Sequence, residues 1–407
     1  MTTYLIRRIL QSIIFLPLAS LLIYTLLVMW MPSGPQSQYN AEKVILDRAA
    51  QDVTPMPELA PTRADFADLE ERYKLNNPWP LNFFVWLFDP NDTTLKGYNI
   101  KGQPIVIQKG INISLGSLSL RGSGMLTGDF GTSTAYATGT PIATILASRW
   151  GGTLVLLSAS FLIALLIGIP LGVVGAVRQR SPLDHTITFF SLAGLSVPSY
   201  VIGLLFIMFL AILPKALHDQ NGWDWLPWLP AGGMGDDDLW SRVTHLALPA
   251  TTLALPQLAW ISRHTRFALL DVLSQDYIRT AWAKGLRSYK VIFKHALRNS
   301  LIPLITQLAL LVPVLMSGAI VVETVFALQG VGKAFFRSIG GCLITYNSLL
   351  SDPAPCPLIG YFPIDYPLAL TLLLIMLVIV AVANVVADML YSIVDPRINY
   401  ESKGRTM

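Results

Sequence analysis

A glycine-rich stretch ending in lysine is the first candidate for chemistry in this chain. It reads Gly330-Val331-Gly332-Lys333, and glycine-rich loops of this kind cradle phosphates in nucleotide-binding proteins. A Walker A loop also requires a glycine five residues before its second glycine, and a serine or threonine after the lysine. Ala327 and Ala334 occupy those positions. We therefore predict that these glycines turn the chain at the mouth of a pore and bind no nucleotide.

No other motif indicates catalysis or a metal site. The sequence lacks HExxH, paired CxxC and GxSxG motifs, which carry zinc and serine-hydrolase chemistry. Its histidines flank apolar runs without metal-ligand spacing on one helical face, and they are His185, His218, His245, His264 and His295. We predict no catalytic residue, no metal, no cofactor bound by this chain and no enzymatic activity of its own.

The two cysteines, Cys342 and Cys356, lie in one predicted external loop. An external compartment is oxidising, and a loop of this length is able to close a disulfide. The sequence favours the bridge over the alternative of two free thiols.

Ionisable residues and prolines inside apolar spans are candidates for a transport pathway. Glu323 lies near the external end of one span, where we expect it to join a hydrogen-bond network at a gate. Asp388 lies in the last turns of another and is expected to pair with an arginine. Pro198, Pro256 and Pro313 interrupt three spans. Broken helices often line transport cavities, but proline is also ordinary in membrane helices, so both interpretations stay open.

The overall composition is that of a membrane protein. Hydrophobic residues make up 53% of the 407 residues, charged residues only 13%, and the mean hydropathy is +0.53. Runs of about 20 apolar residues are long enough to cross a bilayer. They predict an all-α polytopic protein with six transmembrane helices near Ile9–Met31, Thr153–Val177, Thr186–Leu213, Leu246–Ser262, Leu301–Phe326 and Leu368–Val394. The first run is too long for the apolar region of a signal peptide, so we expect it to be retained.

The second span carries a face of small residues. Gly168, Gly172 and Gly175 recur there around Pro170. Small faces allow two helices to approach closely in lipid. Close helix packing is the favoured interpretation, and direct contact with a substrate is the alternative.

The distribution of charge predicts the topology and argues against nucleic acid as the reason for the net charge of +4. In a six-span arrangement, the basic residues near both termini and after the second span fall on one side. Asp236, Asp237 and Asp238 fall on the other side. The positive-inside rule therefore places both termini in the cytoplasm.

The predicted regions follow from this topology. Residues 1–31 contain the N-terminus and the first span, and residues 32–148 form a large external region. Residues 149–399 hold the five-helix core, and residues 400–407 form a cytoplasmic tail. Short alternating runs at Ile105–Ile107 and Ile111–Leu115 predict a small β-hairpin in the external region.

A basic segment between the fourth and fifth spans is the most informative stretch. It runs from Asp276 to Pro303 and carries six lysines and arginines against a single acid. A basic segment between spans belongs on the cytoplasmic side. Its central Gly285 predicts a turn between two short helices. Such a helix-turn-helix at the inner membrane face would suit contact with a cytoplasmic motor.

This segment resembles the EAA loop of ATP-binding-cassette importer permeases of the dipeptide and oligopeptide type. The matching residues are Asp276-Tyr277, Arg279-Thr280-Ala281, Ala283-Lys284-Gly285, His295-Ala296-Leu297-Arg298-Asn299 and Pro303, with Trp282 where the family has arginine. Further likeness lies in residues 126–133, in Glu323-Thr324-Val325-Phe326 with Gly330-Val331-Gly332, and in Asp365-Tyr366-Pro367 followed by Asn384, Asp388, Tyr391 and Asp395-Pro396-Arg397. Residues 89–122 and 340–363 depart from the family and are expected to be external insertions.

The resemblance implies a type I importer permease in the bacterial inner membrane that forms half of a pathway for peptides or similar small solutes. It implies as partners a second homologous permease, two ATPase subunits that bind ATP and Mg²⁺, an external substrate-binding protein and membrane lipid. The coupling loop at residues 276–299 would dock the ATPase through Tyr277, Arg279, Thr280, Ala281, Ala283, Lys284 and Gly285. Ala281 and Ala283 would permit close approach of that partner, and Arg279 and Lys284 would meet its acceptors.

Two other classes of function remain as alternatives. An ion-driven secondary transporter acting alone would require internal repeats and a chain of buried intramembrane charges. No repeat is visible, and Glu323 and Asp388 are too few to form such a chain. A membrane anchor for the external region would not explain the dense motif matches in the cytoplasmic half.

Overall fold

The computed structural model describes residues 11, 15–23, 96–98, 104–106, 113–115, 118–120, 130, 133, 136–137, 140–221, 225, 227–236, 238–309, 311–340 and 365–394. The predicted disulfide between Cys342 and Cys356, the predicted cytoplasmic tail and most of the predicted external region lie outside these residues. The side chain of Asp388 also lies outside them, so its expected arginine partner stays a prediction.

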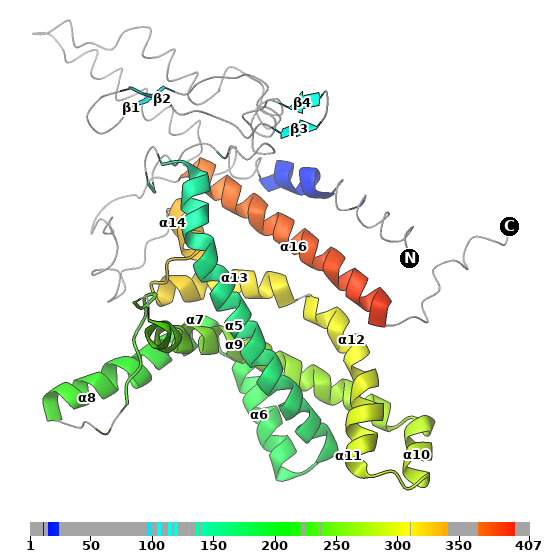
Figure 1. Cartoon of the computed structure of the whole chain (residues 1–407). Coiled ribbons are helices and arrows are strands. Elements are labelled where there is room, and N and C mark those ends of the chain that lie inside the picture. The colour runs from blue at the N-terminus through cyan, green and yellow to red at the C-terminus, as the bar shows by residue number, and fades with distance from the viewer. Residues whose placement is uncertain are drawn as a thin grey trace, which may run out of the picture.

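Long helices dominate the described part of the chain (Figure 1). The largest are α5 (Ile142–Val177), α9 (Leu239–Leu273) and α16 (Tyr366–Val394). Shorter helices lie between α5 and α9, and these are α6 (Pro182–Ser196), α7 (Ser199–Phe206), the π-helical segment η4 (Ile207–Ile212) and α8 (Leu213–Asn221). The all-α class predicted for the membrane part is confirmed.

The second half of the chain continues with α10 (Asp276–Ala283), α11 (Ser288–Lys290) and the π-helical segment η5 (Val291–Leu297). It then forms α12 (Arg298–Ala309), α13 (Leu311–Val325) and α14 (Val331–Ser338) before α16. In Figure 1, α10 and α11 lie at one end of α5 and α14 lies at the other.

The six predicted spans all fall on described helix, at least in part. Three described helices are long and apolar enough to cross a membrane, over Ile142–Val177, Ser199–Gln220 and Pro367–Val386. The fourth predicted span lies inside α9, and the fifth is divided between α12 and α13. The third begins in α6 and is interrupted at Val197, whose extended conformation (ψ 124°) is the one favoured before proline.

The described parts of residues 32–148 include four short strands in two antiparallel hairpins. Strand β1 (Lys96–Tyr98) pairs with β2 (Pro104–Val106), and β3 (Ile113–Leu115) pairs with β4 (Leu118–Leu120). The predicted β-structure is therefore present, but as two hairpins instead of one.

The small-residue face of α5 packs directly on α9. A Cβ added at Gly172 would lie 2.5 Å from the Ser262 carbonyl oxygen and 2.6 Å from the Thr265 Cβ, and one at Gly168 would lie 3.0 Å from the Leu258 oxygen. Any side chain there would hold the two helices apart. The predicted role of this face in close packing is confirmed.

Candidate functional site

The predicted turn at Gly285 is built by a hydrogen-bonded helix end. After α10, the Gly285 N–H donates to the Trp282 oxygen (2.9 Å), and the Leu286 N–H donates to the Ala281 oxygen (3.4 Å). This pair of bonds is a Schellman motif, whose C′ residue adopts a left-handed conformation. Gly285 has φ +70°, and its position is open, with no atom near an added Cβ. Glycine is thus required here by the backbone and not by crowding.

One face of α10 packs on its own chain. Ile278 is fully buried and Ala281 is nearly so. They form a hydrophobic cluster with Val173, Ala176, Leu269, Val291 and Ala296, which come from α5, α9 and η5. The Ala281 side chain therefore packs α10 against the helices beneath it. This corrects our expectation that Ala281 lets a partner approach, an expectation that Ala283, which is exposed, still fits.

The remaining surface of α10 and of its C-cap residue is exposed and largely polar. Tyr277, Arg279, Thr280 and Lys284 are all exposed there. The Tyr277 hydroxyl accepts a hydrogen bond from the Asn299 side-chain amide (3.0 Å), which ties the start of α10 to α12. Among the residues that the structure describes, Arg279 forms only a solvent-exposed ion pair with Asp276 (3.3 Å), and such pairs are weak. The arginine is accordingly available to a partner.

The segment after the turn adds an exposed aromatic surface. The Tyr289 and Phe293 rings lie 6.5 Å apart and are both more than half exposed. Lys290 and Lys294 flank them and are also exposed. Together with the exposed face of α10, this gives a basic and aromatic surface on a buried apolar base.

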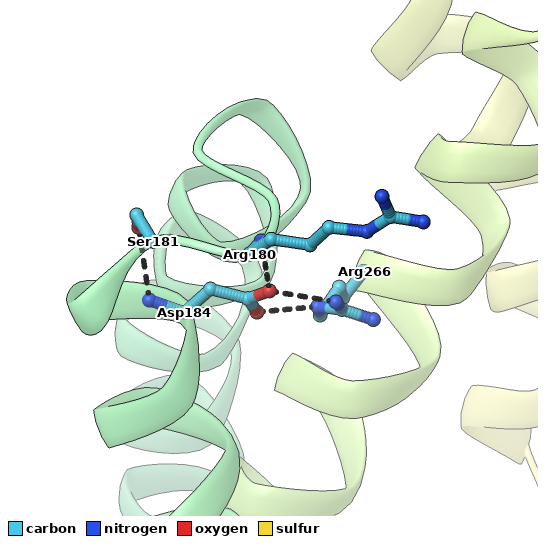
Figure 2. Close-up of polar contacts among 4 residues, drawn as sticks. All are labelled: Arg180, Ser181, Asp184 and Arg266. Carbon is cyan, nitrogen blue, oxygen red and sulfur yellow. Dashed lines mark hydrogen bonds and ion pairs between the residues drawn. The ribbon is translucent and has the colours of Figure 1, made fainter.

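An ion pair braces the helices beneath this surface, and the sequence did not suggest it. Arg266 on α9 binds the Asp184 carboxylate on α6 through two nitrogens, with Nε at 2.6 Å from Oδ1 and Nη2 at 2.8 Å from Oδ2 (Figure 2). The same carboxylate accepts the Arg180 N–H (2.9 Å), in a turn where Arg180 has φ +61°. Ser181 caps α6 by accepting the Asp184 N–H (3.3 Å). Only the Ser-Pro-Leu-Asp helix start is legible from the sequence.

Hydrogen bonds from Arg266 hold the pKa of Asp184 below its ordinary value, and they outweigh the opposing effect of burial. A carboxyl whose pKa is lowered on folding stabilises the protein above its unfolded pKa, about 3.9. That stabilisation is lost as the pH falls through the lower, folded value.

Asp184→Ala is expected to destabilise the protein by about 2–3 kcal/mol at neutral pH, because a largely buried guanidinium loses its partner. Thermal unfolding in detergent should show this deficit from pH 5 to pH 8 and a shrinking deficit below about pH 4. Asp276→Ala, which removes an exposed ion pair, is the control and should leave unfolding unchanged. A deficit that persists undiminished at low pH would contradict the assignment.

A second polar cluster surrounds Glu323 near the opposite end of α5. The Thr153 hydroxyl donates to Glu323 Oε1 (2.7 Å), and the Lys333 N–H donates to Glu323 Oε2 (2.9 Å). The Thr153 oxygen also accepts the Val331 N–H (2.8 Å). Glu323 and Thr153 are both almost completely buried. The carboxylate therefore joins α5 and α13 to the N-terminus of α14.

The glycine-rich stretch forms the cradle for this carboxylate. A Cβ at Gly330 would lie 2.2 Å from Glu323 Cδ, and one at Gly332 would lie 2.9 Å from Oε2. The predicted turn is present, since α13 ends at Val325 and α14 begins at Val331. The two glycines are needed here because the chain closes around a buried side chain of the protein itself.

A third junction joins the residues before α5 to the start of α16. The Asp365 carboxylate accepts hydrogen bonds from the Ser133 hydroxyl (2.5 Å), the Tyr136 N–H (3.0 Å) and the Leu368 N–H (3.2 Å). The Asp365 N–H donates to the Ser338 oxygen at the end of α14 (2.7 Å). Both ends of α14 are thus held by acidic residues of neighbouring segments.

The prolines proposed for the pathway occupy unlike positions. Pro198 is exposed and precedes the first residue of α7, whereas Pro256 lies inside α9 and Pro313 lies in the first turn of α13. No group of three His, Cys, Asp or Glu side chains able to hold a metal ion occurs among the described residues.

Comparisons with known proteins identify the family of this chain. Residues 168–400 match the family described as binding-protein-dependent transport system inner membrane component. The chain belongs to this family. It is 33% identical to the oligopeptide transport system permease protein AppB of Bacillus subtilis, over 98% of this chain and 100% of that protein.

Other relatives of this inner membrane permease match a smaller share of the chain. The dipeptide transport system permease protein DppB of Haemophilus influenzae is 33% identical over 68% of this chain and 78% of its own length. The oligopeptide transport system permease protein OppB of Salmonella typhimurium is 32% identical over 67% and 76%. An inward-facing MetNI methionine ABC transporter structure aligns with a TM-score of 0.45 and 17% identity, covering 62% of this chain and 97% of that one.

Proposed function

We propose that this permease supplies half of the pathway of an ATP-driven importer for peptides or similar small solutes. A second permease would complete the pathway, two ATPase subunits would bind and hydrolyse ATP with Mg²⁺, and an external binding protein would deliver cargo. The support for peptide cargo is the likeness to permeases named for oligopeptide and dipeptide transport.

The basic and aromatic surface around α10 is the observation that carries the coupling role. One side of α10 is fixed on the cluster formed by α5, α9 and η5, while Tyr277, Arg279 and Lys284 remain exposed. A helix that is fixed on one side and basic on its exposed surface is suited to bind a protein partner and to transmit the movement of that partner to the membrane helices. We place this face, and both termini, in the cytoplasm by the positive-inside rule.

The inferred pathway residues are Pro198, Pro256, Pro313 and Glu323. Pro198 and Pro313 lie at the starts of helices and Pro256 lies inside α9, and we infer that these helices line a cavity between two permeases. The docking surface on the ATPase side consists of Tyr277, Arg279, Thr280, Ala283 and Lys284, with Gly285 as the turn.

Reconstitution of the purified complex tests this function. The two permeases, the ATPase subunits and the binding protein are placed in liposomes, and ATP hydrolysis is measured with the binding protein empty and peptide-loaded. We expect loaded binding protein to stimulate hydrolysis and to drive peptide uptake. Peptide uptake by this chain alone, driven by an ion gradient without ATP, would instead establish a secondary transporter. Ligands that copurify with the binding protein would identify the cargo.

A further inference from the structure

Two helical arms connect the surface around α10 to the cluster around Glu323. The first arm is α5, which contributes Val173 and Ala176 to the cluster under α10 and Thr153 to the Glu323 cluster. The 20 residue-to-residue steps from Thr153 to Val173 span about 30 Å of helix. Gly168 and Gly172 pack this arm directly on α9, so that part of the arm is held against a neighbouring helix.

The second arm is the run from η5 through α12 and α13. It starts with Val291 and Ala296 in the cluster under α10 and carries Glu323 near its other end. The two arms therefore meet twice. At one end they meet beneath α10, and at the other the Thr153 hydroxyl meets the Glu323 carboxylate at 2.7 Å. The two meeting points lie about 30 Å apart along α5, and Figure 1 shows α10 and α14 toward opposite ends of that helix.

The far junction also fixes a third element. Val331 and Lys333, at the start of α14, donate their backbone N–H groups to Thr153 and Glu323 (2.8 Å and 2.9 Å). The other end of α14 is bound to Asp365 at the start of α16 through Ser338. A displacement of either arm would therefore move α14 and the start of α16 with it, as long as the Thr153 and Glu323 contacts hold.

We propose that Thr153 and Glu323 are positioning residues that make the two arms move as one unit, so that movement of the ATPase at α10 reaches α14. The inference rests on the proposed function for the direction of the force, and on the contacts above for the joint itself. Neither residue needs to touch cargo. Polar groups buried in this way have few alternative hydrogen-bond partners. The Thr153–Glu323 contact is therefore either fully formed or lost.

Thr153→Val tests the joint with almost no change in shape. Valine removes the hydroxyl that donates to Glu323 and accepts from Val331, which leaves two buried polar groups without that partner. Thr153→Ser keeps the hydroxyl and is the matched control. Hydrogen exchange of a peptide covering residues 329–340 should accelerate by about tenfold or more in the valine variant, and should stay near wild type in the serine variant.

The functional measurement is the ratio of ATP hydrolysis with loaded binding protein to hydrolysis without it, in reconstituted complexes of equal abundance. Thr153→Val should retain basal hydrolysis and ATPase binding, while the ratio falls by about fivefold or more, the usual scale of energetic coupling between sites. Thr153→Ser should restore the ratio. Loss of packing alone would lower complex abundance and basal hydrolysis together.

Two results would overturn the proposal. Unchanged exchange over residues 329–340 in Thr153→Val would show that the hydroxyl does not hold α14. Faster exchange with a wild-type stimulation ratio would show that the joint is local and transmits nothing. Absence of stimulation in the wild-type complex would count against the proposed function and the transmission step together, while the exchange comparison would still decide whether Thr153 holds α14.

Discussion

Replacing Gly285 with leucine is expected to abolish most substrate-stimulated ATP hydrolysis while leaving the permease folded and inserted. Gly285 has φ +70° at the end of α10, and a residue with a Cβ pays about 1–2 kcal/mol to adopt that conformation. The space around it is open, so the effect would come from the backbone alone. Relief of this strain requires breaking the two bonds that close the turn, which reorients α10. The affinity for the ATPase should fall by about 5–30-fold.

Gly285→Asn provides the matched control, because asparagine tolerates the left-handed region far better than leucine. Both variants would be compared at equal complex abundance by ATPase copurification, stimulated hydrolysis and peptide uptake. Asparagine should restore at least part of each activity. If the loop were only a basic anchor on anionic lipid, both variants would behave as wild type and only the removal of several charges would matter. Wild-type coupling in Gly285→Leu would therefore rule out the docking turn.

Gly172→Val should prevent α5 from packing on α9 and cause the largest loss of stability among these changes. The first added carbon would lie 2.5 Å from a backbone oxygen of Ser262, which has no freedom to rotate away. Overpacking usually costs about 1–3 kcal/mol, and occasionally more. We expect the upper end of that range, because the obstacle is main chain. The cluster beneath α10 should also loosen, since Val173 follows directly in the sequence.

Gly151→Val offers a control within the same helix, because Gly151 is exposed and nothing lies near its added Cβ. Both variants replace glycine by valine within α5, so the change in helix propensity is the same. The difference in stability between them therefore reports the effect of packing against α9. The amount of monodisperse protein after purification and the thermal midpoint in detergent are the measurements. Equal midpoints for the two variants would show that α5 and α9 separate without cost.

Sequence patterns alone determined the helical membrane class, the turn at Gly285 and the packing role of the glycines in α5. Each depends on short-range information. Apolar runs of about 20 residues indicate membrane spans and not a soluble protein. A glycine between two polar helical segments marks a chain reversal. Small residues at helical spacing form a flat helix face. The loop at residues 276–299 was recognised for the same reason, since its residues are contiguous.

The tertiary structure decided which polar groups meet and which side chains face inward. Asp184 and Arg266 are 82 residues apart, and Thr153 and Glu323 are 170 apart, so no local pattern marks either pair. Ala281 and Ala283 are the same residue type and lie two positions apart, yet Ala281 is buried and Ala283 is exposed. Successive residues of an α-helix point about 100° apart. The orientation of α10 on α5 and η5 therefore decides which of its residues are buried and which are exposed. Such long-range contacts form only when the helices pack together. A polar group that is buried in this process must form a hydrogen bond with a group that the fold places beside it.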